Sequence, residues 1–117
     1  PNNQLIISAG SDERIRIWPT KINKLEKQLQ SHITNVKCLA LSPNGMLIAS
    51  SDQHIIRVWM ANTGVCIFEL KGHRKYCHKD TEKSGSRGWM GAVTALKFTS
   101  DNQYLISSSN DLTIRVW

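Results

Sequence analysis

Hydrophobic and polar positions alternate along most of the chain in short runs that are separated by turn-forming residues. The runs VKCLALS (36–42) and VTALKFT (93–99) alternate with a period of two, and the polar stretches SPNG (42–45) and SDNQ (100–103) follow them. This alternation is typical of half-buried β-strands, and stretches rich in Pro, Asn, Asp and Gly are typical of tight turns. Because the apolar spacing of three and four that marks an amphipathic helix is absent from the sequence, the pattern predicts an all-β chain.

A segment that combines a polar turn containing Asp, an apolar strand with one Arg and a final Trp occurs three times. The copies are SDERIRIW (11–18), SDQHIIRVW (51–59) and SNDLTIRVW (109–117). Trp18 and Trp59 are 41 positions apart, whereas Trp59 and Trp117 are 58 apart. We interpret residues 74–89 as an insertion within the third repeat. Four short strands in each repeat of this length are typical of a β-propeller blade.

The order of residues within the copies resembles the WD-repeat (WD40) family. A Ser-His or Gly-His pair is followed by an apolar strand, a turn such as SPNG, a Ser-rich strand, an Asp turn and the closing Trp. This resemblance covers nearly the whole chain except the insertion, and three copies agree in order and spacing. The family usually has Asp after the Trp, where this chain has Pro19 and Met60.

The resemblance implies a partial WD40-type β-propeller with three consecutive four-stranded antiparallel blades, of which the first and last are incomplete. We expect ten strands, at about 4–8, 14–18, 25–29, 36–41, 46–51, 55–59, 65–70, 93–98, 103–108 and 113–117. Residues 1–117 are then part of one propeller domain, with repeats ending at Trp18, Trp59 and Trp117. Since a closed propeller needs at least four blades, we expect the chain to be a piece of a larger protein.

The recurring His, Ser, Asp and Trp residues resemble a catalytic set in type, but an enzyme needs one site and not one in each repeat. In WD repeats these residues form a structural hydrogen-bond network, in which Asp bonds to His and a strand Ser joins His to the Trp indole. The resemblance assigns to it Ser8, Asp12 and Trp18; His32, Ser50, Asp52 and Trp59; and His73, Ser107 or Ser109, Asp111 and Trp117. In the second repeat the turn is one residue short, so Gln53 occupies the Asp position and Asp52 precedes it.

Composition narrows the class of protein further. The chain has 15 Lys and Arg against 9 Asp and Glu, a net charge of +6, which permits an acidic partner without requiring one. Arg16, Arg57 and Arg115 each precede a Trp by two positions, and we expect them to pair at blade edges or between blades. A nucleic-acid-binding stripe is the alternative.

The cysteine pattern and the first residues of the sequence predict a reduced, intracellular protein. Cys38, Cys66 and Cys77 are an odd number without regular spacing, which argues against a disulfide framework. The sequence contains no membrane-spanning apolar run and no signal-peptide pattern at its start, so we expect no membrane association.

Motifs for metal binding, phosphate binding and catalysis are weak or absent in the sequence. His73, Cys77 and His78 lie close together, but no second ligand pair with zinc-like spacing follows. SGSRG (84–88) follows no predicted strand and opens no helix, so it is not a phosphate loop, and no G-x-S-x-G motif is present. We therefore expect no enzyme activity, metal, cofactor or small-molecule substrate.

The insertion is the best candidate for binding a partner, because insertions in repeat proteins tend to fall on a binding face. It holds five basic and two acidic side chains and two large aromatic ones. The WD-repeat resemblance places it at the same end of the blades as the Asp turns. The candidate partner-binding residues are Arg74, Lys75, Tyr76, Lys79, Lys83, Arg87 and Trp89 of the insertion, and Ser11, Asn35 and Asn110 nearby.

The function expected from the resemblance is that of a WD-repeat scaffold, which mediates protein–protein interaction within a larger multi-subunit assembly in the cytoplasm or nucleus. The alternative is a WD-repeat subunit whose basic Asp-turn end contacts RNA, DNA or an acidic filament such as microtubules.

Overall fold

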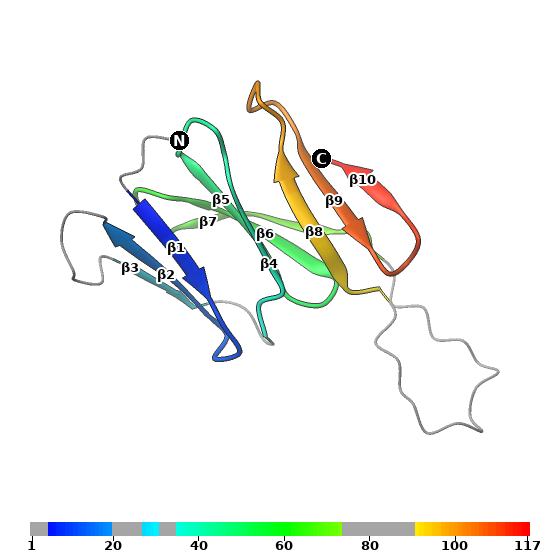
Figure 1. Ribbon diagram of the computed structural model, residues 1–117, viewed down its shortest axis with the longest axis horizontal. Coiled ribbons are helices and arrows are strands. Elements are labelled where there is room, and N and C mark those ends of the chain that lie inside the picture. Colours follow the sequence, from blue (N-terminus) through cyan, green and yellow to red (C-terminus); the bar gives the residue numbers. More distant parts are fainter. Residues whose placement is uncertain (1–4, 20–26, 31–34, 74–90) are drawn as a thin grey trace.

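The computed structural model describes residues 5–19, 27–30, 35–73 and 91–117, and these residues form ten strands and no helix (Figure 1). The strands are β1 (Leu5–Ala9), β2 (Arg14–Pro19), β3 (Lys27–Gln30), β4 (Cys38–Leu41), β5 (Leu47–Ser51), β6 (Ile55–Met60), β7 (Cys66–Lys71), β8 (Val93–Phe98), β9 (Leu105–Ser109) and β10 (Ile114–Val116). The predicted all-β class is confirmed. A helix long and apolar enough for a bilayer span is absent from this part of the chain.

The strands form three antiparallel sheets that stand side by side in Figure 1. Blade 1 contains β1, β2 and β3, blade 2 contains β4 to β7, and blade 3 contains β8, β9 and β10. Within each blade, every strand pairs with its neighbour in sequence, and β4 at the edge of blade 2 packs beside β8 of blade 3. The prediction of three consecutive blades, with the middle one four-stranded, is confirmed.

Apolar side chains fill the two spaces between neighbouring blades. In the first space, Ile15 and Ile17 of β2 pack with Ile48 and Trp59 of blade 2. The second space holds a cluster of Ala49, Ile56, Val58, Val93, Phe98 and Leu105, contributed by blades 2 and 3. Burying one such aliphatic side chain contributes about 1.5–3 kcal/mol. Alternation along each strand therefore places an apolar row on the face that the next blade covers.

Turns with left-handed residues close the hairpins at both ends of the sheets. Gly45 (φ 74°) and Asn102 (φ 61°) occupy corresponding places in the β4–β5 and β8–β9 turns. Gly and Asn adopt this conformation at little cost. At the other end, Glu13 (φ 65°) and Leu112 (φ 66°) correspond to each other in the β1–β2 and β9–β10 turns. The shorter β5–β6 turn contains no positive φ among its described residues.

Candidate functional site

The polar residues of blade 3 form one connected set of hydrogen bonds. His73 Nδ1 lies 2.9 Å from Asp111 Oδ2, and His73 Nε2 lies 2.7 Å from Ser107 Oγ. The indole Nε1 of Trp117 donates to the same Ser107 oxygen at 2.9 Å. His73, Ser107 and Asp111 are all buried. The structure thus brings together the four residues that the resemblance assigned to the third repeat.

For a neutral His73 ring, the chemistry of the donors and acceptors gives each hydrogen bond of this set a direction. An indole nitrogen can only donate, so Ser107 Oγ accepts from Trp117 and its own hydroxyl hydrogen is free to point at His73 Nε2. The Asp111 carboxylate can only accept, so His73 Nδ1 donates to it; in the neutral ring Nε2 then carries no proton and accepts from the Ser107 hydroxyl. Every hydrogen in the chain from Trp117 to Asp111 is used, which is the condition under which a buried polar set stabilises a fold.

The same three residues, Ser107, His73 and Asp111, have the connectivity of a Ser-His-Asp triad. In such a triad the Ser oxygen must be exposed to a substrate and its hydroxyl must be activated by the His. Here Ser107 has an exposed fraction of 0%, and its oxygen already accepts from the Trp117 indole. The arrangement therefore does not present a nucleophile.

Which serine of the SSS run at 107–109 takes part was left open by the sequence. Ser107 makes both bonds, whereas Ser109 Oγ accepts from the Asp111 backbone N–H at 3.1 Å and shapes the turn. Sequence reasoning also missed Thr113, whose backbone N–H donates to Asp111 Oδ1 at 2.9 Å and whose hydroxyl donates to the same oxygen at 2.6 Å. A Thr two positions after the Asp is the signal that was available.

In blade 2 the shortened turn still supplies a buried carboxylate. Asp52 is 5% exposed and lies 3.4 Å from Arg57 Nη1, while the Trp59 indole donates to Ser50 Oγ at 2.8 Å. Gln53, which occupies the counted Asp position, is half-buried, and its carbonyl accepts from the Val93 backbone N–H. His32 lies outside the described residues, so the expected contact with Asp52 stays a prediction.

Blade 1 repeats the Ser–Trp contact near solvent. The Trp18 indole donates to Ser8 Oγ at 3.0 Å, and Ser8 is exposed. Asp12 pairs with Arg16 of its own blade, and this hydrogen bond holds the pKa of the Asp12 carboxyl below its ordinary value. The Ser and Asp side chains of the network are therefore buried in blades 2 and 3 and exposed in blade 1.

Two of the recurring arginines, Arg16 and Arg57, form ion pairs with acidic side chains of their own blades. Arg57 bridges Asp52 of the turn and Glu69 of β7, each at 3.4 Å. Glu69 also pairs with Lys71 at 2.7 Å, and this bond lowers the pKa of the Glu69 carboxyl. The register decides this pairing, since Arg57 lies directly opposite Glu69.

Only some of the candidate partner-binding residues lie in the part of the chain that the structure describes. Ser11, Asn35 and Asn110 are exposed, in the β1–β2 turn, before β4 and in the β9–β10 turn. These three segments lie at the same end of the sheets, the lower side of Figure 1. Arg74, Lys75, Tyr76, Lys79, Lys83, Arg87 and Trp89 lie outside the described residues.

Within the described ranges, no group of three or more His, Cys, Asp and Glu side chains could hold a metal ion. Cys77 and His78 lie outside those ranges. Cys38 and Cys66 are free thiols whose pKa values are raised by burial. Two open hollows of about 240 and 200 Å³ next to β4 have mainly apolar linings and bring no reactive groups together.

Comparison with known families gives a match along most of the chain. Residues 1–19, 23–60 and 82–117 match the model of the WD40 family, described as WD domain, G-beta repeat. Among solved structures, the one titled "Structure of U3-55K" superposes on the whole chain with a TM-score of 0.83 and 26% identity, and the match covers 33% of that chain.

Three relatives of known name match the sequence. Periodic tryptophan protein 2 of Arabidopsis thaliana is 28% identical over 116 residues, 98% of this chain and 11% of that protein. Striatin-4 of Homo sapiens is 34% identical over 76 residues, 64% of this chain and 10% of that protein. Target of rapamycin complex subunit LST8 of Saccharomyces cerevisiae is 28% identical over 117 residues, 97% of this chain and 33% of that protein. The chain thus spans about a tenth to a third of the relatives it matches.

Proposed function

The chain belongs to the WD40 family of WD domain, G-beta repeat proteins, and from this premise we propose that it is a non-enzymatic scaffold. It binds other proteins within a larger intracellular assembly, and the binding surface is the end of the blades that carries Ser11, Asn35 and Asn110. No cofactor or small-molecule substrate takes part in this function.

The observation that supports a scaffold most directly is the state of the polar residues in blade 3. His73, Ser107 and Asp111 are buried, and His73 bonds both of the others, so their polar atoms stabilise the sheet and are not presented to a ligand. The exposed polar side chains instead lie on turns at the end of a packed frame. Loops on a rigid frame are suited to recognition, because little conformational freedom is lost on binding.

The comparisons and the arginines favour protein over nucleic acid as the partner. One relative, LST8 of yeast, is named as a subunit of a complex. A phosphate-binding stripe would need free guanidinium groups, but Arg16 and Arg57 are engaged with Asp12, Asp52 and Glu69. Contact with RNA, DNA or an acidic filament is therefore the second candidate, supported by the net charge of +6.

The test compares two triple variants of the tagged chain in cells, each followed by cross-linking mass spectrometry. One variant places Arg at Ser11, Asn35 and Asn110, and the matched control places Arg at Met46, Ser100 and Gln103, which are exposed in turns at the opposite end. We expect the first variant to lose most of the co-purifying protein and the control to retain it.

Salt and nuclease treatment separate the two candidate functions. Phosphate contacts make log K fall with log salt by nearly one unit of slope for each contact. We expect weak salt dependence and no effect of nuclease. Equal retention of partners by both triple variants, or loss of the partners after nuclease treatment, would refute the proposal.

A further inference from the structure

The β4–β5 turn of blade 2 contains Asn44-Gly45, which is the single Asn-Gly pair in the sequence. In such a pair the backbone nitrogen of the glycine can attack the side-chain carbonyl of the asparagine, because no side chain on the glycine hinders the approach. Gly45 has φ 74°, and a methyl group at this residue would meet no atom within 4 Å. The left-handed backbone of the turn, and not a lack of space, therefore favours Gly at this position.

Hydrogen bonds hold both reacting groups of this pair in place in the folded turn. Asn44 Oδ1 accepts from Ser42 Oγ at 2.7 Å and from the Met46 backbone N–H at 3.0 Å. The Gly45 N–H donates to the Ser42 carbonyl at 2.8 Å. Ring closure needs the Asn44 side chain to swing toward the Gly45 nitrogen and that nitrogen to lose its proton. All of these bonds must therefore break before Asn44 reacts.

The β8–β9 turn of blade 3 shows which side chain the turn accepts in place of Asn44. Asp101 makes the equivalent bonds there, since its Oδ1 accepts from Thr99 Oγ1 and, at 3.0 Å, from the Gln103 backbone N–H. The bond from Thr99 holds the pKa of the Asp101 carboxyl below its ordinary value. A carboxylate thus fits this turn in the position of the asparagine amide. An isoaspartate would instead add a methylene to the main chain within the turn.

We propose that Asn44 is a deamidation site that the folded β4–β5 turn protects, and that this turn accepts the aspartate product but not the isoaspartate product. When the turn opens, Gly45 N loses its proton to a solvent base and forms a bond to Asn44 Cγ, and ammonia leaves. Water then opens the succinimide ring at either carbonyl. Asparagine and water thus give ammonia and either aspartate or isoaspartate, and the product carries an added negative charge.

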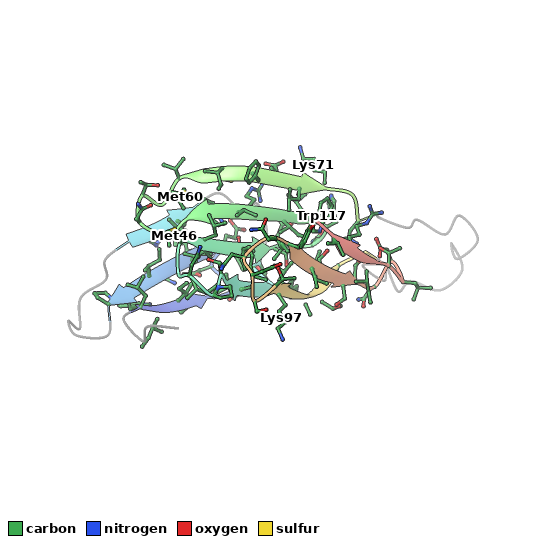
Figure 2. All side chains as sticks on the ribbon, turned by 90° about the horizontal axis from the view of Figure 1, so that it is seen from above. Met46, Met60, Lys71, Lys97 and Trp117 are labelled. Carbon is green, nitrogen blue, oxygen red and sulfur yellow. The ribbon has the colours of Figure 1, made fainter. Side chains whose placement is uncertain are left out.

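The chemistry at this turn is independent of the partner-binding end proposed above. The turn lies at the end of blade 2 where Figure 2 shows Met46 beside Met60, and the strand register pairs Leu47 with Met60. The proposed binding end, with Ser11 and Asn35, is the opposite one. Since Asn44 is exposed, water for the hydrolysis reaches it directly, and its reaction requires opening of the turn and no partner.

The test compares deamidation of the unaltered chain in native buffer and in guanidinium chloride, at the same pH and temperature. Peptide mass spectrometry with electron-transfer fragmentation separates asparagine, aspartate and isoaspartate at position 44. We expect the reaction to be slower in the folded chain by about tenfold or more, because it proceeds only from the opened turn. Asn62 is the internal control, since it is exposed in the β6–β7 turn but precedes Thr63, and it should stay intact in both conditions.

Variants separate the hydrogen bonds of the turn from the chemistry of the pair. Ser42→Ala removes one donor to Asn44 Oδ1 and should raise the rate in native buffer by about threefold or more, because the opened turn is populated more often. Thr99→Ala removes the equivalent donor in blade 3 and should leave that rate unchanged. Gly45→Asn copies Asn102 of the other turn, which has φ 61°, and should slow the reaction in guanidinium chloride.

The two products are tested in the folded chain. Asn44→Asp should keep the urea midpoint of unfolding within about 0.3 M of the unaltered chain. When a chain that has reacted in guanidinium chloride is refolded, the folded fraction should contain aspartate at position 44 and be depleted of isoaspartate. The comparison of native and denatured chains needs no variant, so it remains decisive if Ser42→Ala does not fold.

Three results would overturn the proposal. The first is an equal rate of deamidation in the folded and the denatured chain. The second is a lower rate in Ser42→Ala, which would show that the two donors activate the Asn44 carbonyl as an oxyanion hole does and do not protect it. The third is isoaspartate in the refolded fraction at the proportion found in the denatured chain.

Discussion

Replacing Ser107 by Ala removes the atom through which His73 and Trp117 are joined. Ser107 Oγ accepts from the Trp117 indole at 2.9 Å and bonds His73 Nε2 at 2.7 Å. Because Ser107 is 0% exposed, water does not replace the lost oxygen without a rearrangement of the blade. A buried polar group left without a partner costs about 1–3 kcal/mol, so two such groups predict a loss of roughly 2–6 kcal/mol in the free energy of unfolding.

Urea denaturation followed by circular dichroism measures this loss. With a slope of about 2 kcal/mol per molar urea, the unfolding midpoint should fall by roughly 1–3 M. Ser8→Ala is the matched control, because Ser8 makes the same contact with Trp18 at 3.0 Å but is exposed. We expect it to cost less than about 0.5 kcal/mol, as surface substitutions usually do. Equal losses in the two variants, or a negligible loss in Ser107→Ala, would refute the reasoning.

Three further predictions concern blade 2, the contact between blades and the insertion. Asp52→Ala should destabilise the chain by about 1–3 kcal/mol in the same assay and Gln53→Ala by less, because Asp52 is buried and bonded to Arg57; the opposite order would refute this. Gly72→Ala should cost about 1–3 kcal/mol, since the added methyl would lie 2.8 Å from Trp117 Cη2; an unchanged melting temperature would contradict it. Replacing residues 75–88 by a short linker should leave the far-ultraviolet spectrum unchanged and weaken co-purification of partners; full retention of the partners would exclude the insertion from binding.

The sequence predicted the strands well, because alternation and turn residues act locally. The prediction of 93–98 coincides with β8, but β9 begins at Leu105 and not at 103. The turn is longer than the polar stretch 100–103, because Thr99 and Tyr104 close it. The Tyr104 N–H donates to Thr99 Oγ1, and the Tyr104 carbonyl accepts from the Thr99 N–H. Such bonds depend on the folded turn and leave no signal in the hydrophobic pattern.

Contacts that depend on strand register were less predictable. The serine of the network and the partner of Arg57 follow from which residues lie opposite in the sheets, namely Ser107 opposite Arg115 and Glu69 opposite Arg57. A shift by one residue would turn these side chains to the other face. The irregularity between Val58 and Trp59 changes the register within one strand pair, and a period of two does not reveal it.

The central claim is that His73 belongs to the internal frame of blade 3 and not to an exposed reactive site. Nitrogen-15 NMR of the His73 ring in the folded chain tests this claim most directly. The hydrogen-bond order from Trp117 through Ser107 to Asp111 predicts a proton on Nδ1 that exchanges slowly with water, an unprotonated Nε2, and a shift of the Nε2 resonance in Ser107→Ala. A neutral ring whose proton lies on Nε2 and not on Nδ1, or ring resonances that Ser107→Ala leaves unchanged, would contradict the account.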